Sequence, residues 1–255
     1  MKGETIDEIV AAAKVMRSLA TGVKISKPKH LVDTCGTGGD SSGLFNVSTA
    51  SAFVVASAGG QVAKHGNRSI SSKSGSADVL ETAGVNLDMS PETISNCVEK
   101  IGVGFMFAPA HHSAMKYAIG PRRELAVRTI FNVLGPLTNP AGAPSQVMGV
   151  YHKGLVEPIA HALKNLGSSH VMVVHSNDGL DEISIADSTY VAELKNGMVE
   201  TYSISPSDFN MQQANLDSIC VEDADASLKL IQEALDGQEG PAKDVIALNA
   251  GAAIY

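Results

Sequence analysis

A short apolar run, a glycine cluster and a second apolar stretch follow one another early in the chain and constrain its fold. Residues 31–32 predict a strand, residues 36–39 interrupt it with Gly-Thr-Gly-Gly, and residues 50–58 predict a helix. Residues 46–49 precede that helix with residue types that suit a helix start. A strand, a glycine loop and a capped helix place backbone amides and a helix N-terminus where a phosphate can bind.

Two common nucleotide motifs do not fit this glycine loop. No Gly-Lys-Ser/Thr follows at the Walker A spacing, and Ser41 stands where GxGxxG requires its last glycine. Taken alone, the loop fits a tight turn as well as a phosphate site. A second unusual segment decides between the two interpretations.

That second segment is KHGNRSISSKSGSADVL, residues 64–80. Lysine, arginine, histidine and serine dominate it, and large aliphatic side chains are few, so we interpret it as a polar loop and not as a core element. Its N–H, O–H and cationic donors match a ligand with many anionic oxygens. The two loops together favour a phosphate-bearing ligand over two unrelated turns.

Hydrophobic periodicity predicts the other elements. A strand at 146–151, a helix at 155–166 and a strand at 171–174 are typical of a parallel sheet. The acidic segment 178–184 follows the carboxyl end of the last of these strands, where ligands bind in open α/β sheets. We also expect helices at 5–20 and 91–100, strands at 62–63 and 103–107, a hairpin at 189–203 with its turn at Asn196-Gly197, and two closing helices.

Charge and cysteine content exclude several classes of function. The net charge is −8, from 19 basic and 27 acidic residues, which argues against a nucleic-acid partner. No apolar run of about 18 residues predicts a membrane span. Cys35, Cys97 and Cys220 form neither a CxxC pair nor a zinc pattern, so we interpret them as reduced packing residues of a cytoplasmic protein.

Five segments of the chain form distinctive motifs: GTGGD (36–40), FNVSTA (45–50), KHGNRSISSKSGSADVLE (64–81), RTIFNVLGPLTNPA (128–141) and DGLDEIS (178–184). They resemble the anthranilate phosphoribosyltransferase family of tryptophan biosynthesis, and the resemblance runs through the whole chain in the family's order. It implies an α/β fold of the nucleoside phosphorylase/phosphoribosyltransferase type, with an N-terminal helical portion and a central, mostly parallel sheet flanked by helices.

The resemblance also implies a domain division. Residues 1–27 would be the remnant of an N-terminal helical domain, and residues 28–255 the α/β phosphoribosyltransferase domain, with a helical hinge segment near 108–127. In the family, helical residues precede the KGET motif at the start of this chain, and the final helix continues past Tyr255. We therefore expect a chain trimmed at both ends, whose full-length form is a homodimer. Whether the trimmed chain is active or dimeric is left open by the sequence.

The implied reaction transfers the phosphoribosyl group of phosphoribosyl pyrophosphate (PRPP) to the amino group of anthranilate and releases pyrophosphate. The sugar carbon becomes oxocarbenium-like, and the leaving group carries several charges. Positioning and electrostatics should dominate catalysis, since an arylamine is already a nucleophile. We therefore assign no residue a certain acid–base role.

The family's donor site maps onto the two loops. Lys64 and Arg68 would supply cations, and the backbone of residues 46–49 would meet pyrophosphate at a helix N-terminus. The implied PRPP-binding residues are Gly36, Gly39, Asp40, Asn46, Val47, Ser48, Thr49, Lys64, His65, Gly66, Asn67, Arg68, Ser69, Ile70, Ser71, Ser72 and Ser76.

Magnesium and anthranilate sites complete the implied active site. The family binds Mg²⁺ through Ser48, Asp181 and Glu182, and these hard oxygen ligands suit that ion. The absence of His/Cys clusters argues against a transition metal. The implied anthranilate-binding residues are Gly36, Asn67, His65, His112 and Arg122, with Arg122 on the carboxylate and its neighbour Arg123 as the alternative.

Two positions depart from the family. Leu44 stands where threonine or serine normally helps to bind the donor, and it cannot donate a hydrogen bond; Ala126 stands where glycine is common. The effect of Leu44 on PRPP binding is therefore open.

Three alternatives compete with this interpretation. A pyrimidine nucleoside phosphorylase would carry a KHSGR-like loop, whereas this chain has KHGNR. A non-catalytic paralogue that binds nucleic acid should be basic and should lack Asn67 and Arg122. A catalytically incomplete fragment can be distinguished only by assay.

Overall fold

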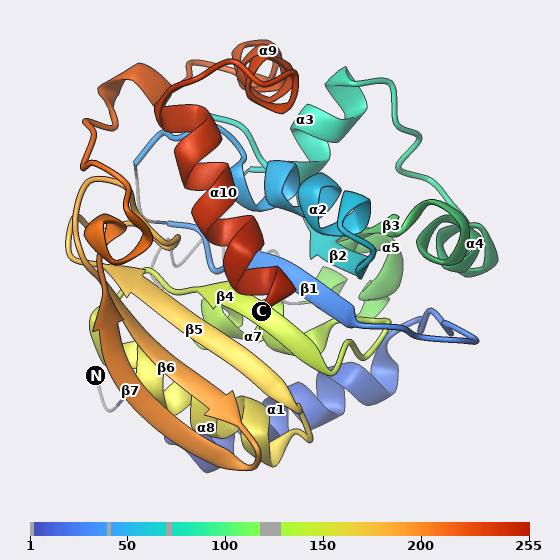
Figure 1. The fold of residues 1–255 in the computed structure, drawn as a ribbon. Coiled ribbons are helices and arrows are strands. Elements are labelled where there is room, and N and C mark those ends of the chain that lie inside the picture. Colours follow the sequence, from blue (N-terminus) through green and yellow to red (C-terminus); the bar gives the residue numbers. More distant parts are fainter. Residues whose placement is uncertain (1–2, 40–41, 70–72, 118–128) are drawn as a thin grey trace.

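The computed structural model describes residues 3–39, 42–69, 73–117 and 129–255. Within these residues the chain forms one seven-stranded sheet in the order β3-β2-β1-β4-β5-β6-β7. Neighbouring strands from β3 to β5 run parallel, and β6 and β7 add an antiparallel edge. The expected α/β fold with a mostly parallel sheet is confirmed (Figure 1). The strands are β1 Leu31–Gly36, β2 Gln61–Gly66, β3 Val103–Phe107, β4 Ser145–Gly149, β5 His170–Ser176, β6 Thr189–Lys195 and β7 Met198–Ile204.

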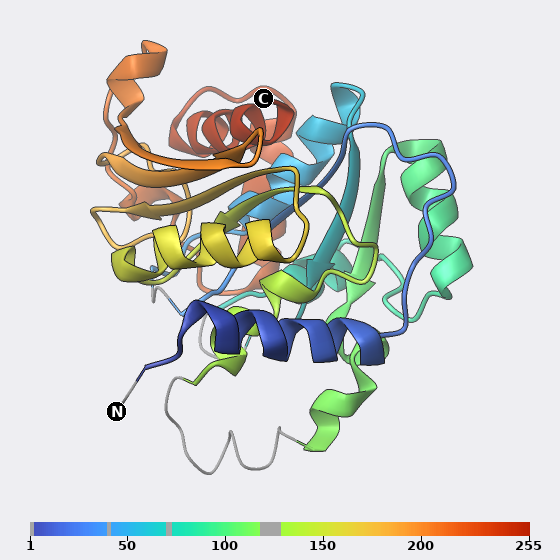
Figure 2. The same cartoon turned by 90° about the horizontal axis from the view of Figure 1, so that it is seen from below.

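Helices cover both faces of this sheet (Figures 1 and 2). On one face, α2 and α10 pack on each other and on β1, and on the other face α1 packs on α8 beneath β5 and β6. The helices are α1 Ile6–Leu19, α2 Val47–Ser57, α3 Ser76–Thr82, α4 Pro91–Ile101, α5 Ala108–His111, α7 Phe131–Leu134, α8 Val156–Asn165, α9 Ala224–Leu235 and α10 Pro241–Ile254.

Local sequence signals explain where several of these elements start and stop. Thr5 and Glu8 form a reciprocal capping box at the start of α1, as Thr5 N donates to Glu8 Oε2 at 2.9 Å. Gly102 ends α4 in a left-handed conformation, with φ of 81°. Asn196 and Gly197 both have positive φ, which confirms the tight turn between β6 and β7.

The apolar core divides between the two faces of the sheet. One cluster joins α1, α8 and the underside of β4 to β6 through side chains such as Ile9, Ile159 and Val173. A larger cluster joins α2, α3, α9 and α10 through side chains such as Val47 and Val245. Among the described residues, no helix combines the length and apolar character needed to cross a bilayer.

The interpretation of residues 64–80 as one polar loop is wrong at both ends. Residues 64–66 complete β2, and α3 begins at residue 76. Lys64 is only 3% exposed and His65 7%, and Ala77 is fully buried. Lys64 and His65 were predicted to lie in a loop because the sequence does not show the polar neighbours that surround them in the fold. The start of α3 was missed because its apolar face, Ala77, Val79 and Leu80, is short.

The predicted hinge segment is only partly visible. Residues 108–111 form α5 and residues 113–115 a single 3-10 turn, whereas residues 118–128 lie outside the described part of the chain. The domain boundary at residue 27 stays a prediction.

Candidate functional site

The carboxyl ends of the parallel strands meet at one edge of the sheet, and the strand order reverses there between β1 and β4. β2 and β3 continue on one side of this pair, and β5 on the other. Such a reversal opens a crevice in which α/β proteins bind ligands. Gly36 and Gly149 end the two strands and lie side by side. Thr37 N donates to Gly149 O at 3.0 Å, so the predicted glycine loop begins at this switch point.

The acidic segment 178–184 packs directly against the two glycines. Asp181 is 8% exposed, and its Oδ2 accepts from Gly38 N at 2.7 Å. A Cβ atom on Gly149 would lie 1.5 Å from Asp181 O, and one on Gly36 would lie 2.4 Å from Asp181 Oδ2. Neither position therefore accepts a side chain without displacing the acidic segment.

Helix α10 holds the acidic segment from behind. Ile183 N donates to Asn249 Oδ1 at 3.0 Å, and Asn249 Nδ2 donates back to Ile183 O at 2.9 Å. Asn249 is 2% exposed, so these bonds lie inside the protein. The carboxylates of Asp181 and Glu182 are thus placed by a helix residue that lies 66 positions beyond Ile183 in the chain.

The first turn of α2 faces the same edge of the sheet. It contains Val47, Ser48 and Thr49, three residues before the helix start expected from sequence. Thr34 Oγ1 donates to Ser48 O at 2.9 Å, and Lys64 Nζ donates to Ser48 Oγ at 3.1 Å. Val47 N donates to Phe45 O at 2.8 Å and Thr49 N to Asn46 O at 3.1 Å, so this helix end offers an anion its dipole and the amide of Ser48.

Lys64 supplies a buried positive charge below that helix end. Its Nζ also donates to Thr34 O. Burial lowers the pKa of Lys64, and the carboxylates of Asp33 and Glu182 oppose that change. Burial raises the pKa of Asp33 to about 6, against the effect of Lys64 and of the bond that Asn139 Nδ2 donates to Asp33 Oδ2 at 2.7 Å. The cation is therefore part of a buried polar network inside the sheet.

His65 points to the opposite face of the sheet from Lys64, as adjacent strand residues do. Its ring lies 5.0 Å from that of His112 between centroids, and its buried Nε2 has no hydrogen-bond partner among the described residues. Burial, together with the charges of His112 and His111, lowers the pKa of His65 to about 3. Burial also lowers the pKa of His112. Both rings are therefore neutral at pH 7 and can offer N–H donors.

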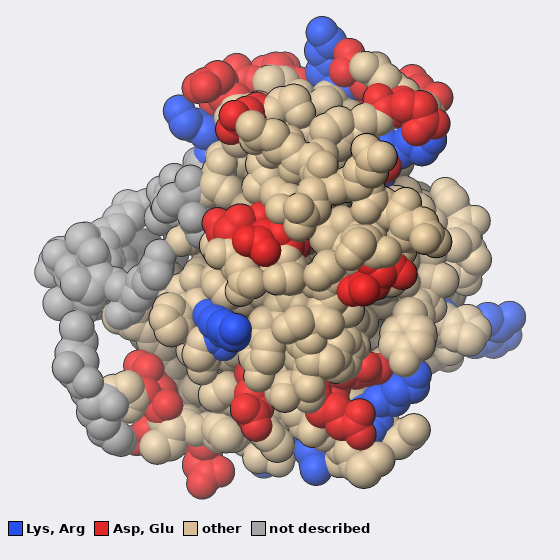
Figure 3. Space-filling view, turned by 60° about the vertical axis from the view of Figure 1, so that its left-hand side comes forward, with Lys and Arg blue, Asp and Glu red and all other residues tan. Residues whose placement is uncertain are grey.

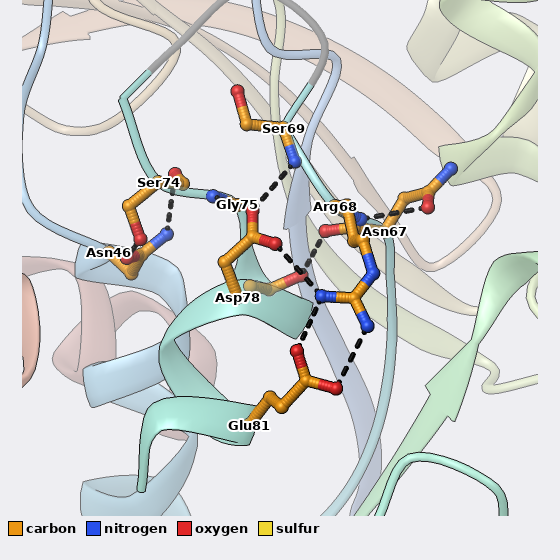
Figure 4. Close-up of polar contacts among 9 residues, drawn as sticks. Asn46, Asn67, Arg68, Ser69, Ser74, Gly75, Asp78 and Glu81 are labelled. Atoms are coloured by element: carbon orange, nitrogen blue, oxygen red, sulfur yellow. Dashed lines mark hydrogen bonds and ion pairs between the residues drawn. The ribbon is translucent and has the colours of Figure 1, made fainter. Parts of the chain in front are cut away.

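The residues that leave β2 and those that enter α3 are held close together. We call these two short runs, residues 67–69 and 73–75, the neck. Asp78 Oδ2 accepts from Ser69 N and from Gly75 N, both at 2.9 Å (Figure 4). A Cβ atom on Gly75 would lie 2.3 Å from Ser69 N, so the two sides of the neck are in direct contact. The predicted donor-binding segment thus has a defined entry and exit.

Arg68 lies on the outer side of the neck and is paired with α3. Its Nη1 and Nη2 donate to the two carboxylate oxygens of Glu81 at 2.6 and 2.9 Å, and Nη1 also donates to Asp78 Oδ1 at 3.2 Å (Figure 4). The guanidinium carbon lies 5.6 Å from the ring centre of Phe107. These carboxylates raise the pKa of Arg68. The predicted phosphate-binding arginine is thus held by carboxylates in this structure.

Asn46 joins the neck to α2 and α9. Its Nδ2 donates to Ser74 O at 3.1 Å, and its Oδ1 accepts from the hydroxyls of Ser74 and Ser227, both at 2.8 Å. Ser227 is fully buried. The backbone N of Asn46 also donates to Ser227 Oγ, at 3.1 Å, so both the side chain and the amide of Asn46 are committed to structural contacts.

The departure at Leu44 has a packing explanation. Leu44 is half-buried against the core cluster around Phe45 and forms an isolated β-bridge with Cys220. An apolar residue suits this position, because it anchors the glycine loop to the segment before α9.

The structure separates the predicted site residues. Arg68 lies on the outer side of the neck, and His65 and His112 lie on the opposite face of the sheet from Lys64. Gly36, Asn46, Ser48, Lys64 and Asp181 converge at the edge where β1 and β4 end. Asp40, Ile70, Ser71, Ser72 and Arg122 lie outside the described residues. Sequence reasoning missed the residues that hold the site together, namely Asp33, Asp78, Asn139, Ser227 and Asn249. Only Asp78 had a local signal, since an acid three residues after a helix start is a capping signature.

The donor set at this edge suits a hard cation. Among the residues that the structure describes, no group of three His, Cys, Asp or Glu side chains could hold a metal by itself. Asp181 and Glu182 with the hydroxyl of Ser48 would leave most of the coordination sphere to water or to a ligand. Mg²⁺ commonly binds in this way, through one or two carboxylates and substrate phosphates.

One face of the molecule shows how its charge is distributed. In Figure 3, acidic side chains occur from top to bottom of this face, and the lysine and arginine side chains drawn there are separated by acidic and neutral ones. The described part of this face therefore carries no continuous basic stripe.

The sequence matches the family described as "Glycosyl transferase family, a/b domain" over residues 28–255. A protein of Ruthia magnifica named anthranilate phosphoribosyltransferase is 71% identical over 255 residues, which are all of this chain and 75% of the relative. A protein of the same name from Thioalkalivibrio sulfidiphilus is 67% identical over the same shares.

Solved structures agree with these sequence relatives. Anthranilate phosphoribosyltransferase from Thermus thermophilus superposes with a TM-score of 0.93 at 42% identity, covering all of this chain and 75% of that one. The Saccharomyces cerevisiae enzyme in complex with PRPP and Mg has a TM-score of 0.85 at 29% identity, covering 96% of this chain and 69% of that one. A further structure of the yeast enzyme contains 4-fluoroanthranilate, with a TM-score of 0.86 at 28% identity over 96% and 68%.

Proposed function

The chain belongs to the anthranilate phosphoribosyltransferases, a glycosyltransferase family of tryptophan biosynthesis, and we propose that its strand-end site binds PRPP, Mg²⁺ and anthranilate for that reaction. The observation that carries the site assignment is the convergence of three family motifs. The glycine loop, the first turn of α2 and the acidic segment meet where β1 and β4 end. The phosphorylase and nucleic-acid-binding alternatives are not favoured, because the close relatives carry the transferase name.

The pyrophosphate of PRPP would lie against the first turn of α2. Ser48 would present its backbone amide there, and Lys64, which donates to the Ser48 hydroxyl, would add a positive charge. The backbone of Gly36 and Gly39 would allow close approach of the ligand on the other side. These groups are fixed before the ligand arrives, so the leaving group would gain stabilisation without reorganising the protein.

Asp181 and Glu182, with Ser48, would hold Mg²⁺. When bound, the ion would neutralise charge on the pyrophosphate as the bond to the ribose breaks. The residues of the chain contribute the positioning: Asn249 and the two strand-end glycines keep the acidic segment against the glycine loop. The yeast relative whose structure contains PRPP and Mg supports this assignment.

Anthranilate would lie on the side of the sheet where His65 and His112 meet. Neutral rings at this position would offer hydrogen bonds without placing a charge beside the aromatic ring. Arg122 remains the proposed partner of the carboxylate and Asn67 a further contact. A yeast structure with 4-fluoroanthranilate supports a ligand of this kind. We further propose a cytoplasmic location and a homodimeric full-length protein.

The direct test is the loss of anthranilate fluorescence when PRPP is added to this chain with and without Mg²⁺. A magnesium-dependent loss is expected. The double variant Asp181→Asn/Glu182→Gln should abolish it, whereas Asp88→Asn/Glu92→Gln, which neutralises two exposed acids near α4, should not. Turnover that is equal without Mg²⁺, or unchanged in the first double variant, would remove the acidic segment from the metal site. No turnover under any condition would contradict the function proposed for this chain.

A further inference from the structure

Asp78 holds the neck together without being one of the proposed ligand-binding groups. One carboxylate oxygen accepts from two backbone amides, Ser69 N and Gly75 N, and the other accepts from Arg68 Nη1 (Figure 4). Ser69 N and Gly75 N come from opposite sides of the neck. A single side chain of α3 thus joins the two sides of the neck and, together with Glu81, holds the arginine.

Neighbouring contacts close the neck on its inner side. Ala77 N and Ser76 Oγ donate to Asn67 O at 3.2 and 3.3 Å. Gly75 allows this approach, since a Cβ atom there would overlap the backbone of Arg68 and Ser69. The main chain is therefore tightly packed where the segment leaves β2 and returns to α3, and Asp78 is the side chain that joins the two sides.

We propose that Asp78 is a positioning residue for the phosphoribosyl donor. It forms the neck before PRPP binds, so that the donor groups of residues 67–69 and Ser76 need not be ordered by the ligand. Preorganisation of this kind strengthens binding by reducing the entropy lost on association. The inference rests on the proposed function, because it assigns the neck to the donor and not to anthranilate.

A simple helix cap would make one of the same contacts but would have no effect on substrate. Asp208 provides the comparison within this chain. It follows β7, and its Oδ2 accepts from Ser205 N at 2.7 Å in the same three-residue geometry. Replacing Asp208 should lower stability without changing substrate use. Asp78 differs because its amide partners belong to a proposed binding segment.

Steady-state kinetics distinguishes the two roles. Asp78→Ala should raise the KM for PRPP about tenfold, the scale expected for lost hydrogen bonds to a charged group, with little change in kcat or in the KM for anthranilate. Asp78→Asn should have a smaller effect, since its amide oxygen can still accept from Ser69 N and Gly75 N. Asp208→Ala and Asp208→Asn are the matched controls. Unchanged KM for PRPP in Asp78→Ala, or a lower melting temperature alone, would overturn the proposal.

Limited trypsin digestion supplies a readout that does not depend on activity. Cleavage after Lys73 should be faster in both Asp78 variants than in the wild type and the Asp208 variants, and PRPP with Mg²⁺ should protect the wild type more. If Asp78→Ala does not fold, Asp78→Asn carries both measurements. An inactive wild type would contradict the proposed function itself, whereas an active wild type with normal KM and normal cleavage in the Asp78 variants overturns only the role of Asp78.

Discussion

Two parts of one motif hold their charges in opposite ways. Lys64, at the start of residues 64–81, is 3% exposed and donates to Thr34 and Ser48 inside the sheet. Arg68 lies four residues later on the surface, where its side chain is 44% exposed and that of its partner Glu81 55%. Lys64 is thus fixed by buried partners, whereas Arg68, a residue of the same charge in the same motif, is held by the exposed carboxylate of Glu81 together with the half-buried Asp78.

The difference teaches which cation can respond to a ligand. A buried charge cannot leave its partners without a large free-energy cost, so Lys64 belongs to the framework of the site. Exposed ion pairs contribute little and are screened by salt, so the contacts of Arg68 can be exchanged for those of a phosphate. The contrast between Lys64 and Arg68 can be tested by substitutions, first at the buried lysine and last at the exposed partner of the arginine.

The largest effect is expected from Lys64→Met. Removing one member of a buried charged group leaves the other uncompensated, so the free energy of unfolding should fall by about 3–5 kcal/mol. Urea denaturation monitored by circular dichroism measures this change. The double variant Asp33→Asn/Lys64→Met should recover much of the stability, because neither charge then remains buried, while PRPP use stays impaired. A single variant as stable as the wild type would show that Lys64 is not part of the framework.

A smaller effect is expected from His65, which makes the free energy of unfolding depend on pH. Its pKa is lowered from 6.5 to about 3 by burial, so the unfolded chain binds a proton more readily between these values. Stability should therefore be fully present above pH 6.5 and be lost as the pH falls towards 3. At pH 5 the loss is about 2 kcal/mol, and it approaches an upper limit of about 5 kcal/mol only near pH 3, since one pKa unit corresponds to about 1.4 kcal/mol.

Asp33 acts in the opposite direction and makes a control possible. Its pKa is raised from 3.8 to about 6, so its ionisation costs the folded state stability as the pH rises between these values. His65→Gln should therefore flatten or reverse the pH dependence of the free energy of unfolding between pH 3 and 6.5. Urea denaturation at a series of pH values checks this. An unchanged slope in the variant would assign the effect to other groups.

The sequence predicted the elements whose residues carry a local signal. Strands at 103–107 and 171–174 were recognised because buried parallel strands are continuously apolar, and the hairpin turn because Asn196-Gly197 suits positive φ. The contact between the glycine loop and the acidic segment was expected, because both follow the carboxyl ends of parallel strands, where open α/β sheets bind ligands. Such features depend on neighbours in sequence or on general topology.

Long-range polar partners could not be predicted in the same way. Asn139 bonds to Asp33 from 106 residues away, and Ser227 bonds to Asn46 from 181 residues away. Asn139 lies in the 128–141 motif and Ser227 in no motif, and in neither case does the local sequence indicate the distant partner. The burial of Lys64 was missed for the same reason, since its partners become visible only when the strands are placed together.

The smallest effect is expected on the exposed side, from Glu81→Gln. The substitution removes the bidentate partner of Arg68 and leaves the contact with Asp78, so the arginine becomes easier to transfer to a phosphate. The KM for PRPP should fall about two- to threefold at low salt, because exposed pairs are worth little, and the difference should shrink as salt screens the pair in the wild type. The melting temperature should not change. A higher KM in Glu81→Gln would mean that Glu81 orients Arg68 for the ligand, and the contrast between an exchangeable Arg68 and a fixed Lys64 would then fail.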